Sequence, residues 1–190
     1  LFSYFVREFE GFDSNGQPIG DNQTFVGKSA LPNVTGGLST SVNYKNWDFS
    51  AYFNSQFGGY NYFNTQNALF TGGSIFGGRN VTTDVPTNGE SGIAEAAVST
   101  RFLYKSDFVR LQNATLGYNF NLKEGAAFTN LRIFVNGQNL FVITDYPGLD
   151  PEVNTAPNAD NLLNGLPTAG IDYAAYPNPR TITFGLNAQF

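Results

Sequence analysis

The stretch that decides the fold is residues 36–57, which read GGLSTSVNYKNWDFSAYFNSQF. On both sides of Lys45-Asn46, apolar residues alternate with small polar ones. One face of the first half carries Leu38, Thr40, Val42 and Tyr44, and one face of the second half carries Trp47, Phe49, Ala51, Phe53 and Phe57. Because side chains alternate across a strand, this pattern predicts a hairpin with one apolar face and one small-polar face.

The same alternation recurs in residues 107–122, 131–141 and 180–190, where Phe134 is the exception. The opening segment, roughly residues 1–12, is strand-like but alternates poorly. About six strands are therefore predicted, most of them about 10–14 residues long. Strands of soluble proteins usually run about 5–6 residues, whereas tilted strands that cross a bilayer need about 9–11.

The predicted connections alternate between short and long. Two residues join the first hairpin and a handful join residues 107–122 to 131–141, whereas the segments at about 13–35, 58–106 and 142–179 are long and rich in Gly, Asn, Pro and Asp. Short turns alternating with long loops are typical of outer-membrane barrels. The fold class predicted is therefore all-β, an antiparallel transmembrane β-barrel.

A soluble β-sandwich is the alternative, since its strands also alternate. Long strands, an uncharged polar face and very long loops argue against it. Six strands cannot close a barrel alone, because the smallest membrane barrels have about eight, so we expect further strands elsewhere in the polypeptide. Helical periodicity is weak, and its best candidate is residues 90–103.

The composition excludes several functional classes. Charged residues make up 13% of the chain, while Cys and His are absent. No disulfide, thiol nucleophile, Ser-His-Asp triad or two-His metal site can form. The net charge of −5 argues against a nucleic-acid partner. We predict no enzymatic activity and no cofactor.

Three blocks carry a family resemblance, with a fourth upstream: residues 106–120, 131–153, 170–190 and 26–64. In their order and spacing they resemble the C-terminal end of SusC/RagA-type TonB-dependent outer-membrane transporters of Bacteroidetes. The least family-like part is the loop at about 64–100. By this resemblance residues 1–190 are the C-terminal part of a 22-stranded barrel, with the plug domain and signal peptide absent from this chain.

The resemblance also implies partners and a location. It implies a multi-pass protein of the outer membrane that works with a SusD-like surface lipoprotein and imports oligosaccharides or peptides. TonB would act through the missing N-terminal region.

The terminal strand is the clearest candidate site. Its alternating stripe ends on an aromatic residue and consists of Ile182, Phe184, Leu186, Ala188 and Phe190. The stripe resembles the signal read by the outer-membrane assembly machinery, and a free alternating strand suits β-augmentation. The other interpretation is that these residues only face the lipid bilayer, and both can hold.

Two further groups are candidate substrate or rim contacts. Asn136, Gln138 and Asn139 lie where a strand meets a long loop, although an amide ladder lining a wet interior explains them as well. Tyr60, Tyr62 and Phe63 lie at the mouth of a long loop, where rings could stack on sugars. Tyrosines also populate the interfacial belt of any barrel, and we favour the belt.

No metal site is predicted. Residues 13–24 match four EF-hand positions, but Pro18 replaces the Gly and Thr24 replaces the bidentate Glu, so an Asn15-Gly16 turn is favoured. Asp145, Asp150, Glu152 and Asp172 show no spacing for calcium or acid–base chemistry, and we interpret them as turn residues.

Two functions of different classes remain open. The first is TonB-dependent import, and the alternative is a structural or scaffold subunit of an outer-membrane complex without transport. A secreted glycan-binding β-sandwich is a third hypothesis.

Overall fold

The computed structural model describes residues 3–20, 22–92, 97–122, 127–155 and 168–190. They divide into two units. The sheet unit comprises Val34–Phe57, Asp107–Asp145 and Asn178–Phe190, and the loop unit comprises Leu1–Asn33, Gly58–Ser106 and Tyr146–Pro177. Among the described residues, no helix is long and apolar enough to cross a membrane.

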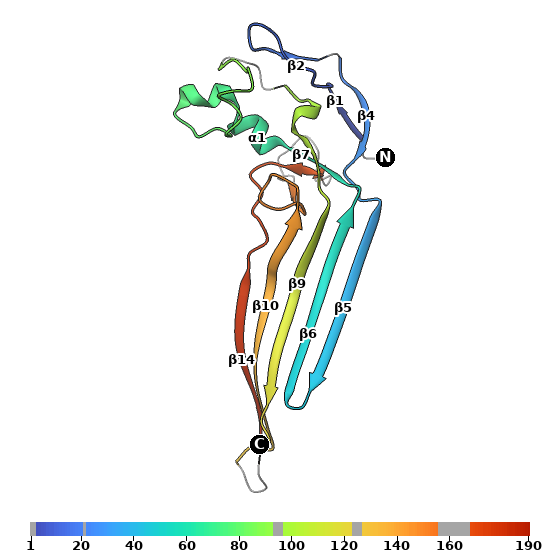
Figure 1. The fold of residues 1–190 in the computed structure, drawn as a ribbon, viewed down its shortest axis with the longest axis vertical. Coiled ribbons are helices and arrows are strands. Elements are labelled where there is room, and N and C mark those ends of the chain that lie inside the picture. Colours follow the sequence, from blue (N-terminus) through green and yellow to red (C-terminus); the bar gives the residue numbers. More distant parts are fainter. Residues whose placement is uncertain (1–2, 21, 93–96, 123–126, 156–167) are drawn as a thin grey trace. The chain divides into compact units, whose positions relative to one another are not determined.

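The sheet unit is one antiparallel sheet of five strands in the order β14-β10-β9-β6-β5 (Figure 1). The strands are β5 (Val34–Tyr44), β6 (Trp47–Phe57), β9 (Phe108–Asn119), β10 (Asn130–Thr144) and β14 (Thr181–Gln189). All five lie within or around the segments whose alternation predicts them. The all-β, antiparallel part of the prediction is confirmed.

The turn between β5 and β6 is as short as the sequence predicts. Tyr44 pairs with Trp47, and Lys45 between them has a φ of 53°. The side-chain amide of Asn46 donates to the backbone carbonyl of Asn119 at 2.7 Å, and the backbone N–H of Asn119 donates to the backbone carbonyl of Asn46 at 2.8 Å. These two bonds tie the turn to the end of β9.

The loop unit contains only short elements. Its strands are β1 (Ser3–Val6), β2 (Gly11–Phe12), β3 (Pro18–Ile19), β4 (Thr24–Ser29), β7 (Tyr60–Phe63), β8 (Leu103–Lys105), β11 (Asn154–Thr155), β12 (Thr168–Ala169) and β13 (Ile171–Asp172). Its helices are α1 (Asn64–Leu69) and the 3-10 turns η1 (Gly72–Gly77) and η2 (Thr100–Phe102). Strand β7 pairs with β8 and, in parallel, with β13, so three distant segments share one small sheet.

Two predicted elements differ from the structure. The opening segment is not a sixth long strand, because β1 pairs with β4 and β2 pairs with β3 in separate small sheets. Residues 90–103, the best candidate for the weak helical periodicity, do not form a continuous helix where the structure describes them. Only η2 is helical there, β8 begins at Leu103, and residues 93–96 lie outside the described residues.

Candidate functional site

The five strands are paired so that their apolar residues fall in rows across one face. One row runs across all five strands and contains Val42, Phe49, Leu116, Val135 and Phe184. The next row lies two residues further along each strand. The row at the turn end contains Tyr44, Trp47, Tyr118, Ile133 and Leu186. A one-residue slip of any strand would move its apolar side chains to the other face, so this register specifies which face is apolar.

The apolar face is largely uncovered. Phe184 is 81% exposed, Leu186 62% and Tyr44 65%. Soluble monomers rarely expose continuous apolar patches larger than a few hundred Å², and larger patches mark surfaces that contact a partner or a membrane.

Two β-bulges keep this face apolar along the whole sheet. Between Gln138 and Phe141, β10 contains one more residue than β9, and between Asn113 and Leu111, β9 contains one more than β6. Asn139 lies in the β10 bulge with a φ of 50°, a conformation that Asn adopts more readily than most residues. The bulges place Leu111 and Phe141 in the same row as Phe53.

The opposite face is lined by small polar side chains in the same register. One row contains Ser41, Ser50, Thr115, Asn136 and Thr183, and the next contains Ser39, Tyr52, Asn113, Gln138 and Thr181. The amide of Asn136 donates to Thr115 Oγ1 at 2.7 Å and to Asn113 Oδ1 at 3.1 Å. These side chains form a polar, neutral surface suited to contact with water.

A charged pair interrupts the polar face near the turn end. Arg132 donates from Nε and Nη2 to the carboxylate of Asp48, which also accepts a hydrogen bond from Asn119 at 3.1 Å. Gly117 lies between the partners, and a Cβ there would collide with both side chains. The guanidinium of Arg132 also lies 5.0 Å from the Phe134 ring.

Phe134, the exception to the alternation, lies on the polar face for a structural reason. Its ring covers Gly185 of the edge strand β14, where a Cβ would overlap the ring atoms. A ring over a glycine in an edge strand replaces the packing that the glycine cannot supply.

The predicted contact residues of β10 lie in different environments. Asn136 belongs to the polar ladder, and Gln138 lies on the same face and is exposed. Asn139 lies in the bulge and donates to the carbonyl of Pro179 at 3.1 Å. The structure therefore gives Asn139 a role within the protein, and a substrate contact by any of the three stays a prediction.

The predicted aromatic group of the loop unit is mostly buried. Tyr62 is 5% exposed and Phe63 8%, packed edge-on against Phe102 and Tyr104 respectively. Burial raises the pKa of Tyr62 to about 12. Such rings offer no free face for stacking in this structure. Tyr60 is half-buried, with Lys28 Nζ 4.9 Å from its ring, so it is the member of the group that keeps accessible surface.

A buried carboxylate closes the core of the loop unit. Asp172 is 4% exposed and accepts a hydrogen bond from the Tyr146 hydroxyl at 2.9 Å. Burial raises the pKa of Asp172, with a further contribution from the buried Asp150, against the opposing hydrogen bonds from Tyr146 and Thr65. The pKa of Tyr146 is also raised, first by its burial and then by Asp172.

A second buried cluster joins the middle loop to the start of the chain, and no local pattern predicts it. The Glu90 carboxylate, 1% exposed, accepts hydrogen bonds from Arg101, Asn88 and the Gly72 amide. Burial alone would raise the pKa of Glu90, but these bonds outweigh it and lower the pKa. The Arg101 guanidinium lies 4.9 Å from the rings of both Phe12 and Phe102.

The terminal stripe lies on an edge strand with one neighbour, β10. Ile182, Phe184 and Leu186 all point to the apolar face, and Phe190 is 86% exposed with its ring 5.0 Å from that of Phe128. The Thr129 amide donates to the carbonyl of Gln189 at 2.7 Å. The other edge of β14 carries no strand pairing within the described residues, and the assembly role of the stripe stays a prediction.

The Asn15-Gly16 turn is confirmed. Asp13 Oδ1 accepts the amides of Asn15 and Gln17 at 2.9 and 2.8 Å, and Gly16 has a φ of 72°. Asp21, the ninth EF-hand position, lies outside the described residues. Among the described residues no three His, Cys, Asp or Glu side chains are grouped to hold a metal ion.

An antiparallel sheet of long strands with one exposed apolar face and one polar face has the construction of a transmembrane β-barrel wall. Comparison with known proteins agrees. The chain is 33% identical over 192 residues to TonB-dependent receptor P3 of Formosa agariphila, covering 96% of the chain and 19% of that protein. It is 28% identical over 209 residues to TonB-dependent receptor SusC of Bacteroides thetaiotaomicron, covering 99% of the chain and 19% of that protein.

A solved structure of the RagAB peptide transporter superposes with a TM-score of 0.76 at 21% identity, covering 99% of this chain and 22% of that chain. The RagAB peptide importer in its 'open-open' state gives a TM-score of 0.75. No family model matches. Over nearly its whole length the chain is thus related to SusC/RagA-type TonB-dependent receptors, which confirms the predicted resemblance and fold class. It spans about a fifth of the length of these curated relatives.

Proposed function

We propose that this chain is part of the barrel wall of an outer-membrane TonB-dependent importer that takes up oligosaccharides or peptides. The single observation that carries the proposal is the division of the five-stranded sheet into two faces in register. The apolar face suits lipid, and the Ser, Thr and Asn rows suit a water-filled lumen. The relatives named as receptors and importers support the same assignment.

The proposed partners follow from the same relationship. A SusD-like surface lipoprotein would act with the barrel on the outer side, and TonB would supply energy through a region outside this chain. The chain itself contributes wall and loop segments and no catalytic chemistry.

The candidate residues take roles within this proposal. Tyr60 is the ring of the aromatic group most able to contact a substrate, and Gln138 with Asn136 would line the lumen. Asn139 would shape the strand end where it meets the loop. The stripe from Ile182 to Phe190 would be read by the assembly machinery, and the same side chains would face lipid.

The test uses the full-length polypeptide in its native host. Deletion of its gene should abolish growth on one oligosaccharide or peptide source, and complementation should restore it only when TonB is functional. If growth is unaffected but a membrane complex falls apart, the alternative function as a scaffold subunit is favoured.

The assembly role is tested separately. Removal of Phe190 should lower the amount of full-length receptor in outer membranes, whereas Tyr176→Ala, at another highly exposed aromatic in the loop unit, should not. Unchanged insertion after removal of Phe190 would leave lipid contact as the only role of the stripe.

A further inference from the structure

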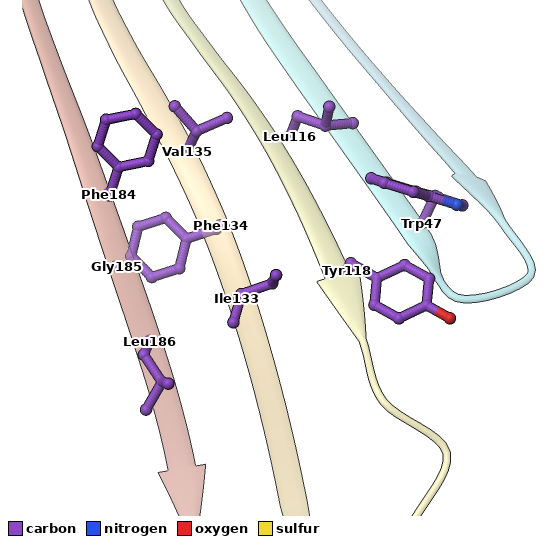
Figure 2. Close-up of a pocket in the computed structure, with 9 residues that line it drawn as sticks. All are labelled: Trp47, Leu116, Tyr118, Ile133, Phe134, Val135, Phe184, Gly185 and Leu186. Atoms are coloured by element: carbon purple, nitrogen blue, oxygen red, sulfur yellow. The ribbon is translucent and has the colours of Figure 1, made fainter.

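The apolar face of the sheet contains a groove of about 670 Å³ close to the turn end (Figure 2). Four strands, β6, β9, β10 and β14, contribute to it. The volume lies within the range of about 300–1,000 Å³ found for small-molecule sites. The groove is open on one side and its lining is mainly apolar, so an apolar molecule would fit it.

Large side chains flank the groove and smaller aliphatic ones form its floor. Trp47 and Tyr118 meet edge to face at a centroid distance of 4.9 Å on one side, and Phe184 stands on the other. Between them Leu116 pairs with Val135, which gives a floor of branched carbon. Figure 2 shows these side chains projecting from the same face. The lining is suited to a flexible hydrocarbon chain.

One end of the groove has a polar and cationic boundary. Trp47 and Tyr118 carry an indole N–H and a hydroxyl, and amphipathic rings of this kind lie at the level of lipid headgroups. Lys45 precedes them in the turn, exposed, with Nζ 5.3 Å from the ring of Tyr44, the residue paired with Trp47. A lysine beside a membrane surface attracts anionic headgroups.

We propose that this groove holds one acyl chain of a phospholipid whose phosphate lies beside Lys45. The inference rests on the proposed function, since it requires the apolar face to be in a bilayer. Apolar and charge complementarity together select the occupant: a hydrocarbon chain matches the floor, and a phosphate matches the ammonium of Lys45, which lies beside the ring of Tyr44 next to Trp47. A bound lipid would fill a surface that otherwise leaves Phe184 and Trp47 81% and 49% exposed.

The test measures phospholipid retained by the full-length receptor purified from outer membranes in mild detergent, using native mass spectrometry. Leu116→Trp fills the floor, while Val42→Trp places the same ring on the same face but on β5, outside the groove. The receptor and Val42→Trp should each retain one more phospholipid than Leu116→Trp. Lys45→Ala should reduce the preference for phosphatidylglycerol over phosphatidylethanolamine severalfold.

A second variant guards against misfolding. Tyr118→Ala removes a ring from the side of the groove, outside the terminal stripe, and should also lose the phospholipid while the barrel keeps its heat-modifiable mobility. Equal phospholipid content in the receptor, Leu116→Trp and Tyr118→Ala would overturn the proposal, as would a density map with a second protein seated on the groove. A chain soluble without detergent would instead overturn the proposed function.

Discussion

Removing the Glu90 carboxylate tests how the middle loop is held, because four hydrogen bonds converge on it. Arg101 donates to it from Nη1 at 3.2 Å and Nη2 at 2.8 Å, Asn88 from Nδ2 at 2.8 Å and Gly72 from its amide at 3.1 Å. Glu90→Ala would leave the Arg101 guanidinium, whose side chain is 15% exposed, without its carboxylate among three phenylalanine rings.

The expected cost follows from this burial. Removing one partner of a buried ion pair destabilises a protein by about 3–5 kcal/mol. Because Arg101 keeps some exposure, we expect about 3 kcal/mol, which is a factor of roughly a hundred in a local opening equilibrium. Glu90→Gln keeps the shape without the charge and should fall between the wild type and Glu90→Ala.

Amide hydrogen exchange of the full-length receptor in detergent reports the opening. The Ser91 amide donates to the carbonyl of Gly16 at 2.8 Å, and its protection should fall about a hundredfold in Glu90→Ala. Glu10→Ala is the matched control, since Glu10 is an exposed acid of the same unit. Unchanged protection of Ser91 in Glu90→Ala, or a loss no larger than in Glu10→Ala, would refute the reasoning.

Three further outcomes are expected. The pKa of Asp172 is raised in the folded protein, so its contribution to stability is present at low pH and is lost as the pH rises through the folded pKa. Asp172→Asn should therefore slow hydrogen exchange of the Tyr62 amide at neutral pH and remove this pH dependence. Faster exchange of that amide would contradict the prediction. Gly185→Ala, which drives a Cβ into the Phe134 ring, should cost about 1–3 kcal/mol and lower the yield of heat-modifiable barrel. Gly77→Ala should have neither effect, because a Cβ at this position would meet open space. Asp48→Asn should lower the free energy of unfolding by at most about 1 kcal/mol, measured by thermal unfolding, because the side chains of Asp48 and Arg132 are 28% and 23% exposed. A loss as large as that of Glu90→Ala would show that this pair is effectively buried.

The long strands were predictable because their information is local. In residues 36–57 apolar and polar side chains alternate, so the polarity of each side chain indicates which face of the strand it occupies. The predicted hairpin matches β5 and β6 closely. The same rule failed for residues 1–12, since β1 depends on a partner, β4, that begins at Thr24. A short, poorly alternating segment does not itself carry the information about its partner.

The candidate site residues divide in the same way. Membership of Asn136 and Gln138 in the polar face follows from their spacing, and the structure agrees. The burial of Tyr62 and Phe63 could not be read from FGGYNYFN, because it depends on Phe102 and Tyr104 about forty residues away. An aromatic residue in a loop looks the same in sequence whether it packs inward or faces a ligand.

By itself the sequence determined the two-faced strands, the turn at Lys45-Asn46 and the kinship with SusC/RagA-type receptors. A side-chain period of two and a two-residue turn are properties of neighbouring residues. Only the tertiary structure decided the register that aligns Phe49, Leu116, Val135 and Phe184, the bulge at Asn139 and the Glu90–Arg101 cluster. Each of these depends on side chains brought together from separate segments, where hydrogen bonding and the exclusion of water choose among partners that the local pattern leaves equivalent.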